Sequence, residues 1–298
     1  MIDTGRRSFT PTRTAAAVTV AELVAHGDRL LRPSESARLD AELLLASVLE
    51  RDRTALYRER ELAVGRLQRD RFEQLLEARA AGRPVAQLLG EAEFWSLPFL
   101  VNRDVLIPRP ETELLVETVL DRIPRTGGSL VADLGTGSGV IAIVVGLQRP
   151  RATVVAVDRS GSALRTARQN CARHGVSGVH LLQSDWLDAV RTTRFDVIVS
   201  NPPYVAAADA LLSNSDIRFE PTSALVGGSD GLGALRAIVA QAPAYLKSGG
   251  CLCVEHGYNQ GSRLRKLFQE QGFRRVATAR DLAGLERVTF GEKGHRDG

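Results

Sequence analysis

The sequence predicts an α/β protein, in which a small bundle of helices precedes a larger domain built on a mostly parallel sheet. From Leu130 onward, short apolar runs alternate with helical patterns, which is the order expected of parallel strands joined by crossover helices. A glycine-rich loop follows the first apolar run, and the residues before Gly82 show helical rather than strand periodicity. Hydrophobic residues make up 44% of the chain, so a sizeable core can be buried.

The helical bundle is expected over residues 18–82 and consists of three short amphipathic helices. Thr19 and Glu22 have the spacing of a capping box, which marks the start of the first helix. In the second helix, apolar residues recur at helical spacing between Ala41 and Leu49. Residues 1–17 are expected to form a disordered basic arm. The three helices are expected from Thr19 to about Leu31, from Pro33-Ser34 onward, and from about Leu67 to Ala81.

Residues 83–106 are expected to link the bundle to the sheet through a β-hairpin. Aromatic and apolar side chains gather around Pro98 in this stretch, which suits two short strands better than a helix. Pro108-Arg109-Pro110 then interrupts regular structure before a helix from Glu111 to Arg122.

The domain of residues 107–298 is expected to carry a seven-stranded sheet with helices on both faces. Its last two strands are joined without a helix, so the final strand is expected to run antiparallel. The expected strands are 130–134, 153–157, 179–182, 196–200, 250–255, 274–278 and 286–291, and the helices among them are about 139–148, 162–173, 232–246 and 260–271.

Composition narrows the class of protein. No stretch approaches the roughly 18 consecutive apolar residues of a membrane span. The three cysteines lack metal-ligand spacing, and Cys251 and Cys253 share one face of an apolar strand, which suits core packing in a reducing compartment. We therefore expect a cytoplasmic protein that holds no metal. A net charge of +4 is compatible with a nucleic-acid-associated partner without requiring one.

Candidate ligand-binding residues follow the first three strands, at the edge where ligands bind in open α/β sheets. The glycines of Gly135-Thr136-Gly137-Ser138-Gly139 let the backbone approach a nucleotide or nucleoside cofactor closely, although a tight turn uses glycines in the same way. Asp158 can accept hydrogen bonds from both ribose hydroxyls, or it can cap a helix. Asp185 is placed to meet an adenine amino group, and Trp186 either flanks the adenine ring or is a buried structural residue.

The most specific motif is Asn201-Pro202-Pro203-Tyr204, directly after the fourth strand. The side-chain carbonyl of Asn201 can accept one hydrogen bond from a target amino group, and the backbone carbonyl of Pro202 can accept another. Two acceptors hold the nitrogen with its lone pair aimed at an electrophilic methyl group. Tyr204 offers a flat face on which a planar amide or base can stack. Together with the glycine loop, the motif predicts methyl transfer to a planar amide or amino nitrogen.

These residues resemble the class I methyltransferases with an Asn-Pro-Pro-Tyr motif, and among them the release-factor glutamine N5-methyltransferases, also called the PrmC or HemK family. The resemblance covers nearly the whole chain from about residue 18, whereas residues 1–17 match nothing in the family. The matching segments are Gly82-Arg83-Pro84-Val85, Glu93-Phe94-Trp95, Ile107-Pro108-Arg109-Pro110-Glu111-Thr112-Glu113, Asp216-Ile217-Arg218-Phe219-Glu220-Pro221, Glu255-His256-Gly257, Gln260-Gly261, and Asp281-Leu282-Ala283-Gly284 before Arg287.

The resemblance implies a Rossmann-like methyltransferase domain, a hairpin linker and an N-terminal helical domain for substrate recognition. It implies S-adenosyl-L-methionine as the cofactor, held by Gly135 to Gly139, Asp158, Trp186 and Asn201, and we expect Asp185 to bind the cofactor as well. It implies a protein substrate, the glutamine of the Gly-Gly-Gln loop in class 1 peptide-chain release factors. We also expect a monomer that requires no nucleic acid or membrane. That glutamine is expected to lie against Asn201, Pro202, Pro203, Tyr204 and Arg109, of which Asn201, Pro202 and Tyr204 are the expected catalytic residues.

Four other functions remain as alternatives. A sister family that methylates a ribosomal protein shares Asn-Pro-Pro-Tyr but lacks the Glu-Thr pair, so Arg109 to Thr112 favours the release-factor branch. An adenine-N6 methyltransferase could use the same motif on a flipped base but predicts a dedicated nucleic-acid-binding domain. The glycine spacing disfavours a nicotinamide oxidoreductase. The presence of every candidate site residue disfavours a module that only senses the cofactor without catalysis. We expect a structural role for His256, an ion pair at Glu286-Arg287, and no metal site among His26, His174, His180 and His295.

Overall fold

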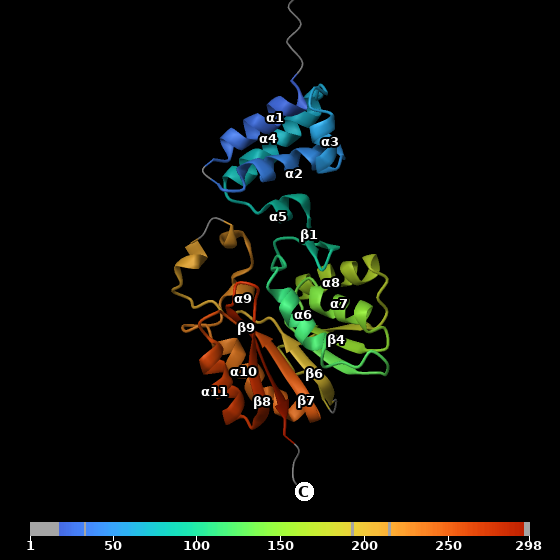
Figure 1. The fold of residues 1–298 in the computed structure, drawn as a ribbon, viewed down its shortest axis with the longest axis vertical. Helices are drawn as coiled ribbons and strands as arrows, with labels where there is room; N and C mark the ends of the chain where they lie inside the picture. Colours follow the sequence, from blue (N-terminus) through green and yellow to red (C-terminus); the bar gives the residue numbers. More distant parts are fainter. Residues whose placement is uncertain (1–17, 33, 192–193, 214–215, 295–298) are drawn as a thin grey trace, which may run out of the picture. The chain divides into compact units, whose positions relative to one another are not determined.

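The computed structural model describes residues 18–32, 34–191, 194–213 and 216–294, and the chain divides into two compact units between Ala81 and Gly82 (Figure 1). The expected arm of residues 1–17 and His295 lie outside the described residues. No helix in the described part of the chain combines the length and the apolarity needed to cross a lipid bilayer.

The first unit is a bundle of helices. Its described residues form α1 (Val20–Leu30), α2 (Ala37–Leu49), α3 (Arg53–Arg58) and α4 (Arg66–Ala80). Apolar side chains from these helices are fully buried, among them Leu44, Leu45, Phe72 and Leu76. The capping box at the start of α1 is formed, because the Glu22 backbone N–H donates to Thr19 Oγ1 and the Thr19 N–H donates to Glu22 Oε2.

Two short helices are absent from the sequence prediction, and the first of them makes the expectation of three helices in the bundle wrong. The first is α3, where the Asp52 side chain accepts a hydrogen bond from the Ala55 N–H at 2.7 Å and caps the helix. The second is α5 (Val85–Leu89), which occupies the start of the expected hairpin linker and ends at Gly90 with a φ of 75°. Helices of five or six residues are too short to show a hydrophobic period.

The second unit contains the expected hairpin and the expected sheet. The hairpin pairs β1 (Glu91–Phe94) with β2 (Leu97–Leu100), and the seven-stranded sheet has the order β5-β4-β3-β6-β7-β9-β8. As expected, β9 runs antiparallel to its neighbours, whereas β3 to β7 are parallel. The seven strands are β3 (Leu130–Leu134), β4 (Thr153–Asp158), β5 (Val179–Gln183), β6 (Phe195–Ser200), β7 (Leu246–Glu255), β8 (Phe273–Arg280) and β9 (Glu286–Lys293).

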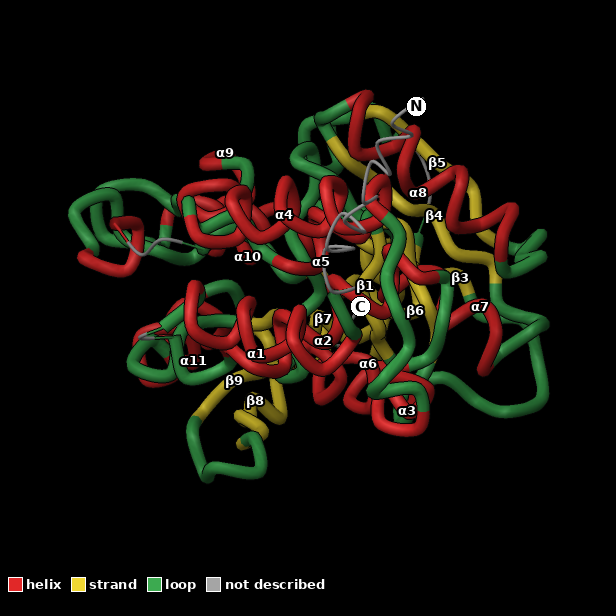
Figure 2. Tube along the Cα trace, turned by 90° about the horizontal axis from the view of Figure 1, so that it is seen from above, coloured by secondary structure: helices red, strands yellow, loops and turns green. Residues whose placement is uncertain are grey.

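Helices cover both faces of the sheet, which explains why its central strands are apolar on both sides. Val131 of β3 belongs to one buried cluster and the next residue, Ala132, to the other, because successive strand residues point to opposite faces. The first cluster includes α6 (Thr112–Leu120) and α7 (Val140–Gln148), beside which lies α8 (Gly161–Arg173). The second includes α10 (Gly233–Tyr245) and α11 (Gly261–Glu270), on the other side of β3 and β6 in Figure 2.

The order of the strands determines where a ligand can bind. The chain builds the sheet outward from β3 through β4 to β5 and then returns to place β6 on the other side of β3. The connections therefore diverge between β3 and β6, which opens a crevice at the carboxyl ends of these strands. The glycine loop follows β3 and Asn201 follows β6, so both predicted motifs lie at this switch point.

Two expectations for strand side chains have different outcomes. Cys251 and Cys253 are buried on the same face of β7 with their Sγ atoms 3.7 Å apart, which confirms their role in core packing. The expected ion pair between Glu286 and Arg287 is wrong. Neighbouring strand residues point to opposite faces, and accordingly Glu286 pairs with Arg265 while Arg287 pairs with Asp281.

Candidate active site

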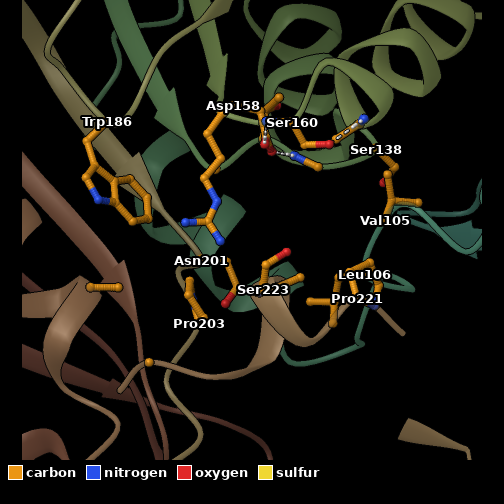
Figure 3. A pocket seen from close by; sticks show the side chains of 18 of the residues that line it. Val105, Leu106, Ser138, Asp158, Ser160, Trp186, Asn201, Pro203, Pro221 and Ser223 are labelled. Carbon is orange, nitrogen blue, oxygen red and sulfur yellow. Dashed lines mark hydrogen bonds between the residues drawn. The ribbon is translucent and has the colours of Figure 1, made fainter. Parts of the chain in front are cut away.

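A cavity of about 410 Å³ lies at the switch point and brings most of the predicted site residues together (Figure 3). Figure 3 shows Trp186 on one side of this cavity and Val105 and Leu106 on the other. The predicted residues that line it are Arg109, Gly135, Thr136, Gly137, Ser138, Asp158, Asp185, Trp186, Asn201 and Pro203. Three predicted residues, Gly139, Pro202 and Tyr204, are not among its lining residues.

The glycine loop is held in its shape by the strand beside it. The backbone N–H groups of Gly135 and Thr136 both donate to the carbonyl of Val157 in β4, at 2.8 and 2.9 Å. Gly135 and Gly137 have φ angles of 73° and 57°, a region that residues with a Cβ rarely adopt. No protein atom lies within 4 Å of the position that a Cβ on Gly137 would take, so the backbone is open to a ligand there.

Gly139 has a different function in the structure. Its φ is 85°, but a Cβ at this position would lie 3.2 Å from the side chains of both Ala167 and Ile143. Gly139 also precedes the first residue of α7. The glycine therefore permits α7 and α8 to pack closely and does not itself face the cavity.

Alanine substitutions should separate the two roles of these glycines. Gly137→Ala should destabilise the protein by about 1–2 kcal/mol, the cost of the left-handed conformation alone. Gly139→Ala should lose about 1–3 kcal/mol more, because its Cβ must also be accommodated between two helices. Thermal unfolding of both variants tests this, with about 2–4 °C expected per kcal/mol for a unit of this size. Equal losses in melting temperature would show that packing does not require the glycine at position 139.

Asp158 both supports the loop and faces the cavity. Its Oδ2 accepts the N–H of Gly137 at 2.9 Å, and its Oδ1 accepts the N–H of Ser160 at 2.8 Å. The helix cap of α8 is Ser160, whose side chain accepts the Ala163 N–H, so Asp158 does not cap that helix. A carboxylate has about four acceptor positions. Two therefore remain on Asp158 for a ligand.

Asp185 and Trp186 line the cavity beyond β5. Asp185 is exposed, whereas Trp186 is half-buried and packs against the cluster beneath α10 and α11. A Cβ on Gly135 would lie 3.6 Å from the Trp186 ring, which shows that the ring lies next to the glycine loop. Trp186 is thus both packed against the core and a wall of the cavity, and its place beside an adenine ring stays a prediction.

The Asn201 side chain has a defined orientation. Its Nδ2 donates to Thr112 Oγ1 at 3.0 Å, while its Oδ1 accepts no hydrogen bond from a described residue. The backbone carbonyl of Pro202 is likewise unused by the described donors. Neither acceptor that the sequence predicts for a target amino group is therefore used by a described donor, although Pro202 itself is buried and does not line the cavity.

Tyr204 is anchored at both ends. Its hydroxyl donates to Glu255 Oε1 at 3.2 Å, and its backbone carbonyl accepts from Gln260 Nε2 at 3.0 Å. Burial, followed by the neighbouring Glu255, raises the pKa of Tyr204, so the phenol stays protonated. A Cβ on Gly231 would lie within 2.4 Å of the Tyr204 carbonyl, so only glycine allows the segment after the motif to fold back onto it.

Arg109 is held by a residue that the sequence analysis did not assign. Its guanidinium forms an ion pair with Glu220 Oε1 at 2.5 Å, and Glu220 Oε2 accepts the Ile107 N–H at 2.9 Å. Glu220 is buried, and burying a carboxylate requires such partners. The segment 107–112 is therefore tied to the segment that follows η2 (Ile217–Phe219), next to α9 (Thr222–Leu225).

Other residues of the site were also missed. Thr112, Ser160, Pro221, Ser223 and Gly227 line the cavity. Thr112 and Pro221 lie in segments that resemble the family but received no role in the site, and the residue types of Ser160, Ser223 and Gly227 carry no signal without the fold. Asp133, near the end of β3, is buried beneath the glycine loop. Its Oδ2 accepts from Thr136 Oγ1 at 2.6 Å, and burial raises its pKa to about 7.

His256 does not line the cavity. Its Nδ1 bonds the Gly257 carbonyl and its Nε2 the Thr289 hydroxyl, both at 2.9 Å, and burial lowers its pKa. These contacts fit the expected structural role.

Comparison with known proteins identifies the family. Residues 110–217 match the methyltransferase small domain, and residues 22–90 match the PrmC N-terminal domain. The release factor glutamine methyltransferase of Xylella fastidiosa strain 9a5c is 47% identical over 254 residues, which cover 85% of this chain and 92% of the relative. The enzyme of that name from Pseudomonas aeruginosa PAO1 is 48% identical over 265 residues, covering 89% and 96%. A methyltransferase structure from Pyrococcus furiosus shares the fold with a TM-score of 0.53 at 18% identity, covering 76% of this chain and 99% of that one. The chain therefore belongs to the release factor glutamine methyltransferase family.

Proposed function

We propose that this protein transfers a methyl group from S-adenosyl-L-methionine to the side-chain nitrogen N5 of the glutamine in the Gly-Gly-Gln loop of a peptide-chain release factor. By family, it is an S-adenosylmethionine-dependent protein-glutamine N5-methyltransferase. The observation that carries the proposal is the orientation of Asn201, whose side-chain carbonyl is available in the cavity that the glycine loop also lines.

The cavity fits this cofactor in size and chemistry. Its volume of about 410 Å³ lies within the range of about 300–1,000 Å³ typical of small-molecule sites. The open backbone at Gly135 to Gly137 suits close approach, and the two remaining acceptor positions of Asp158 suit the ribose hydroxyls. We assign the adenine end to Asp185 and Trp186. When bound, S-adenosylmethionine supplies an electrophilic methyl group.

The residues of the motif then orient the target nitrogen. We assign its two N–H groups to Asn201 Oδ1 and the Pro202 carbonyl, which points the nitrogen lone pair toward the cofactor side of the cavity. An amide nitrogen is a poor nucleophile because its lone pair is delocalised into the carbonyl. Both acceptors bind the N–H groups more strongly as positive charge develops on nitrogen, so they favour the transition state. The extra proton leaves after methyl transfer, so a strong base is not needed.

Other parts of the chain receive supporting roles in this proposal. Pro203 and the flat face of Tyr204 hold the glutamine amide, and Arg109 contacts the loop that carries it. The helical unit of residues 18–82 recognises the body of the release factor, in keeping with its match to the PrmC N-terminal domain. Three free cysteines suit a reducing compartment, and we place the activity in the cytoplasm, carried out by a monomer.

A labelling experiment tests the proposed substrate. The protein is incubated with methyl-labelled S-adenosylmethionine and one acceptor at a time: a class 1 release factor, the same factor with Ala in place of the Gly-Gly-Gln glutamine, ribosomal proteins, DNA or RNA. We expect label only on the unmodified release factor and a mass gain of one methyl group on its loop peptide. Label on ribosomal protein or nucleic acid, or equal label on the two release factors, would contradict the proposal.

A further inference from the structure

A chain of buried polar groups beneath Asn201 has no role in the assignments above. Thr112 is 2% exposed and Glu255 is 1% exposed. Thr112 accepts from Asn201, and the Glu255 carboxyl accepts from the Tyr204 hydroxyl. Thr112 is also near enough to this carboxyl to lower the pKa of Glu255, although burial raises it by more. The four side chains therefore link the cavity to the end of β7.

Two of these buried groups are complementary, an acceptor and a donor hydrogen that each lack a partner in the described part of the chain. Glu255 Oε2 is buried and accepts no hydrogen bond of ordinary geometry from a described residue. The hydroxyl hydrogen of Thr112 has no other acceptor among the described residues. An unpaired buried polar group costs about 1–3 kcal/mol, so a donor and an acceptor that face each other gain by pairing.

We propose that Glu255 is a positioning residue that acts through Thr112 to fix which end of the Asn201 side-chain amide faces the cavity. In this proposal the Thr112 hydroxyl turns its hydrogen toward Glu255, because a carboxylate can only accept hydrogen bonds. The Thr112 oxygen is then left to accept, and the group of Asn201 that can donate to it is Nδ2. Oδ1 consequently faces the target nitrogen. The inference rests on the role proposed above for Asn201.

The reversed orientation would disable the site. An Asn201 side chain turned by 180° would present its NH₂ group to the NH₂ group of the target glutamine, and two donors cannot pair. Asparagine alone cannot select the productive orientation, because its two ends are nearly equal in size. A buried carboxylate at the end of the chain removes the ambiguity.

The direction in which these linked groups donate their hydrogen bonds should depend on pH. Burial raises the pKa of Glu255 to about 7. The protonated acid carries an O–H group that can donate to Thr112, which releases the Thr112 hydroxyl to donate to Asn201 Oδ1. Turnover should therefore be full above the pKa of Glu255 and fall as the pH drops through about 7. The charged or titratable groups that face Glu255 or its partner Tyr204 come from three other elements, as Tyr204 after β6, Arg109 and Glu111 before α6, and Arg287 on β9.

Three variants test the positioning role, with kcat measured from pH 6 to 9 at saturating cofactor and release factor. Glu255→Gln and Thr112→Val keep the shape of each side chain and should each lower kcat at pH 8 by about tenfold, the effect of one lost orienting hydrogen bond. Both should also lose the decline in kcat below pH 7. Thr112→Ser, the matched control, keeps the hydroxyl and should retain kcat within about threefold and the wild-type pH profile.

The double variant Glu255→Gln/Thr112→Val distinguishes a relay from separate structural effects. Residues that act through one chain should give a double variant no slower than Thr112→Val, whereas independent effects multiply to about a hundredfold. A multiplied loss, or a Glu255→Gln enzyme within about twofold of wild type at every pH, would overturn the inference. If Glu255→Gln fails to fold, the comparison of Thr112→Val with Thr112→Ser decides. A wild-type protein that leaves the release factor unmethylated contradicts the proposed function instead.

Discussion

Replacing Asn201 by alanine is expected to lower the turnover of release-factor methylation by about 10²–10³ while leaving the fold and measurable cofactor binding intact. The substitution removes the acceptor for one N–H of the target amide. The hydrogen bond to that acceptor strengthens as positive charge develops on the nitrogen, so its loss slows the reaction. It also leaves the buried Thr112 hydroxyl without its Asn201 partner, so a small loss of melting temperature should accompany the kinetic effect. Single-turnover methylation at saturating cofactor and release factor is the measurement.

Tyr204→Phe is the matched control for Asn201→Ala. It keeps the flat face that stacks on the amide and removes only the hydroxyl that donates to Glu255. Its loss of turnover should therefore be the smaller of the two. Methylation by Asn201→Ala within a few-fold of wild type would refute the assignment of two acceptors to the target nitrogen.

Asp158→Ala is expected to weaken S-adenosylmethionine binding by about ten- to hundredfold, with little change in affinity for the release factor. The charge-assisted contacts to the ribose are worth about 1.5–3 kcal/mol, which sets that range. The structure adds a second cause in the same direction. The Gly137 N–H loses its acceptor in this variant, so the glycine loop is also less well held. Isothermal titration calorimetry with the cofactor measures the effect.

Asp188→Ala is a suitable control, because Asp188 is an exposed aspartate that does not line the cavity. It should bind the cofactor as wild type does. Unchanged cofactor affinity in Asp158→Ala would show that this carboxylate only supports the loop. Asp158→Asn removes the charge and keeps one side-chain oxygen, which can accept from the Gly137 or the Ser160 N–H but not from both.

The architecture of the catalytic unit could be predicted because it is recorded in local patterns. The central strands β3, β4 and β6 are largely apolar, since they lie inside the sheet between two layers of helices, and the longer amphipathic helices such as α1, α8 and α11 show their period. The prediction failed where elements are short, at α3 and α5, and where a pair was inferred from adjacency, at Glu286 and Arg287. Adjacent residues of a strand point to different faces of the sheet, and only the fold shows which partners each face meets.

The sequence by itself determined which strands carry the site, because the glycine loop and Asn201-Pro202-Pro203-Tyr204 each follow directly on an apolar run. Only the tertiary structure decided how those residues act. Thr112 orients Asn201 from 89 positions away, Glu220 holds Arg109 from 111 positions away, and Gly139 belongs to the packing of two helices and not to the cavity. The physical reason is that hydrogen-bond partners and desolvation depend on which segments the fold brings together. Residue spacing along the chain does not show which segments are neighbours in space. Only the three-dimensional structure shows that the buried carboxyl of Glu255 contacts the residues of the site.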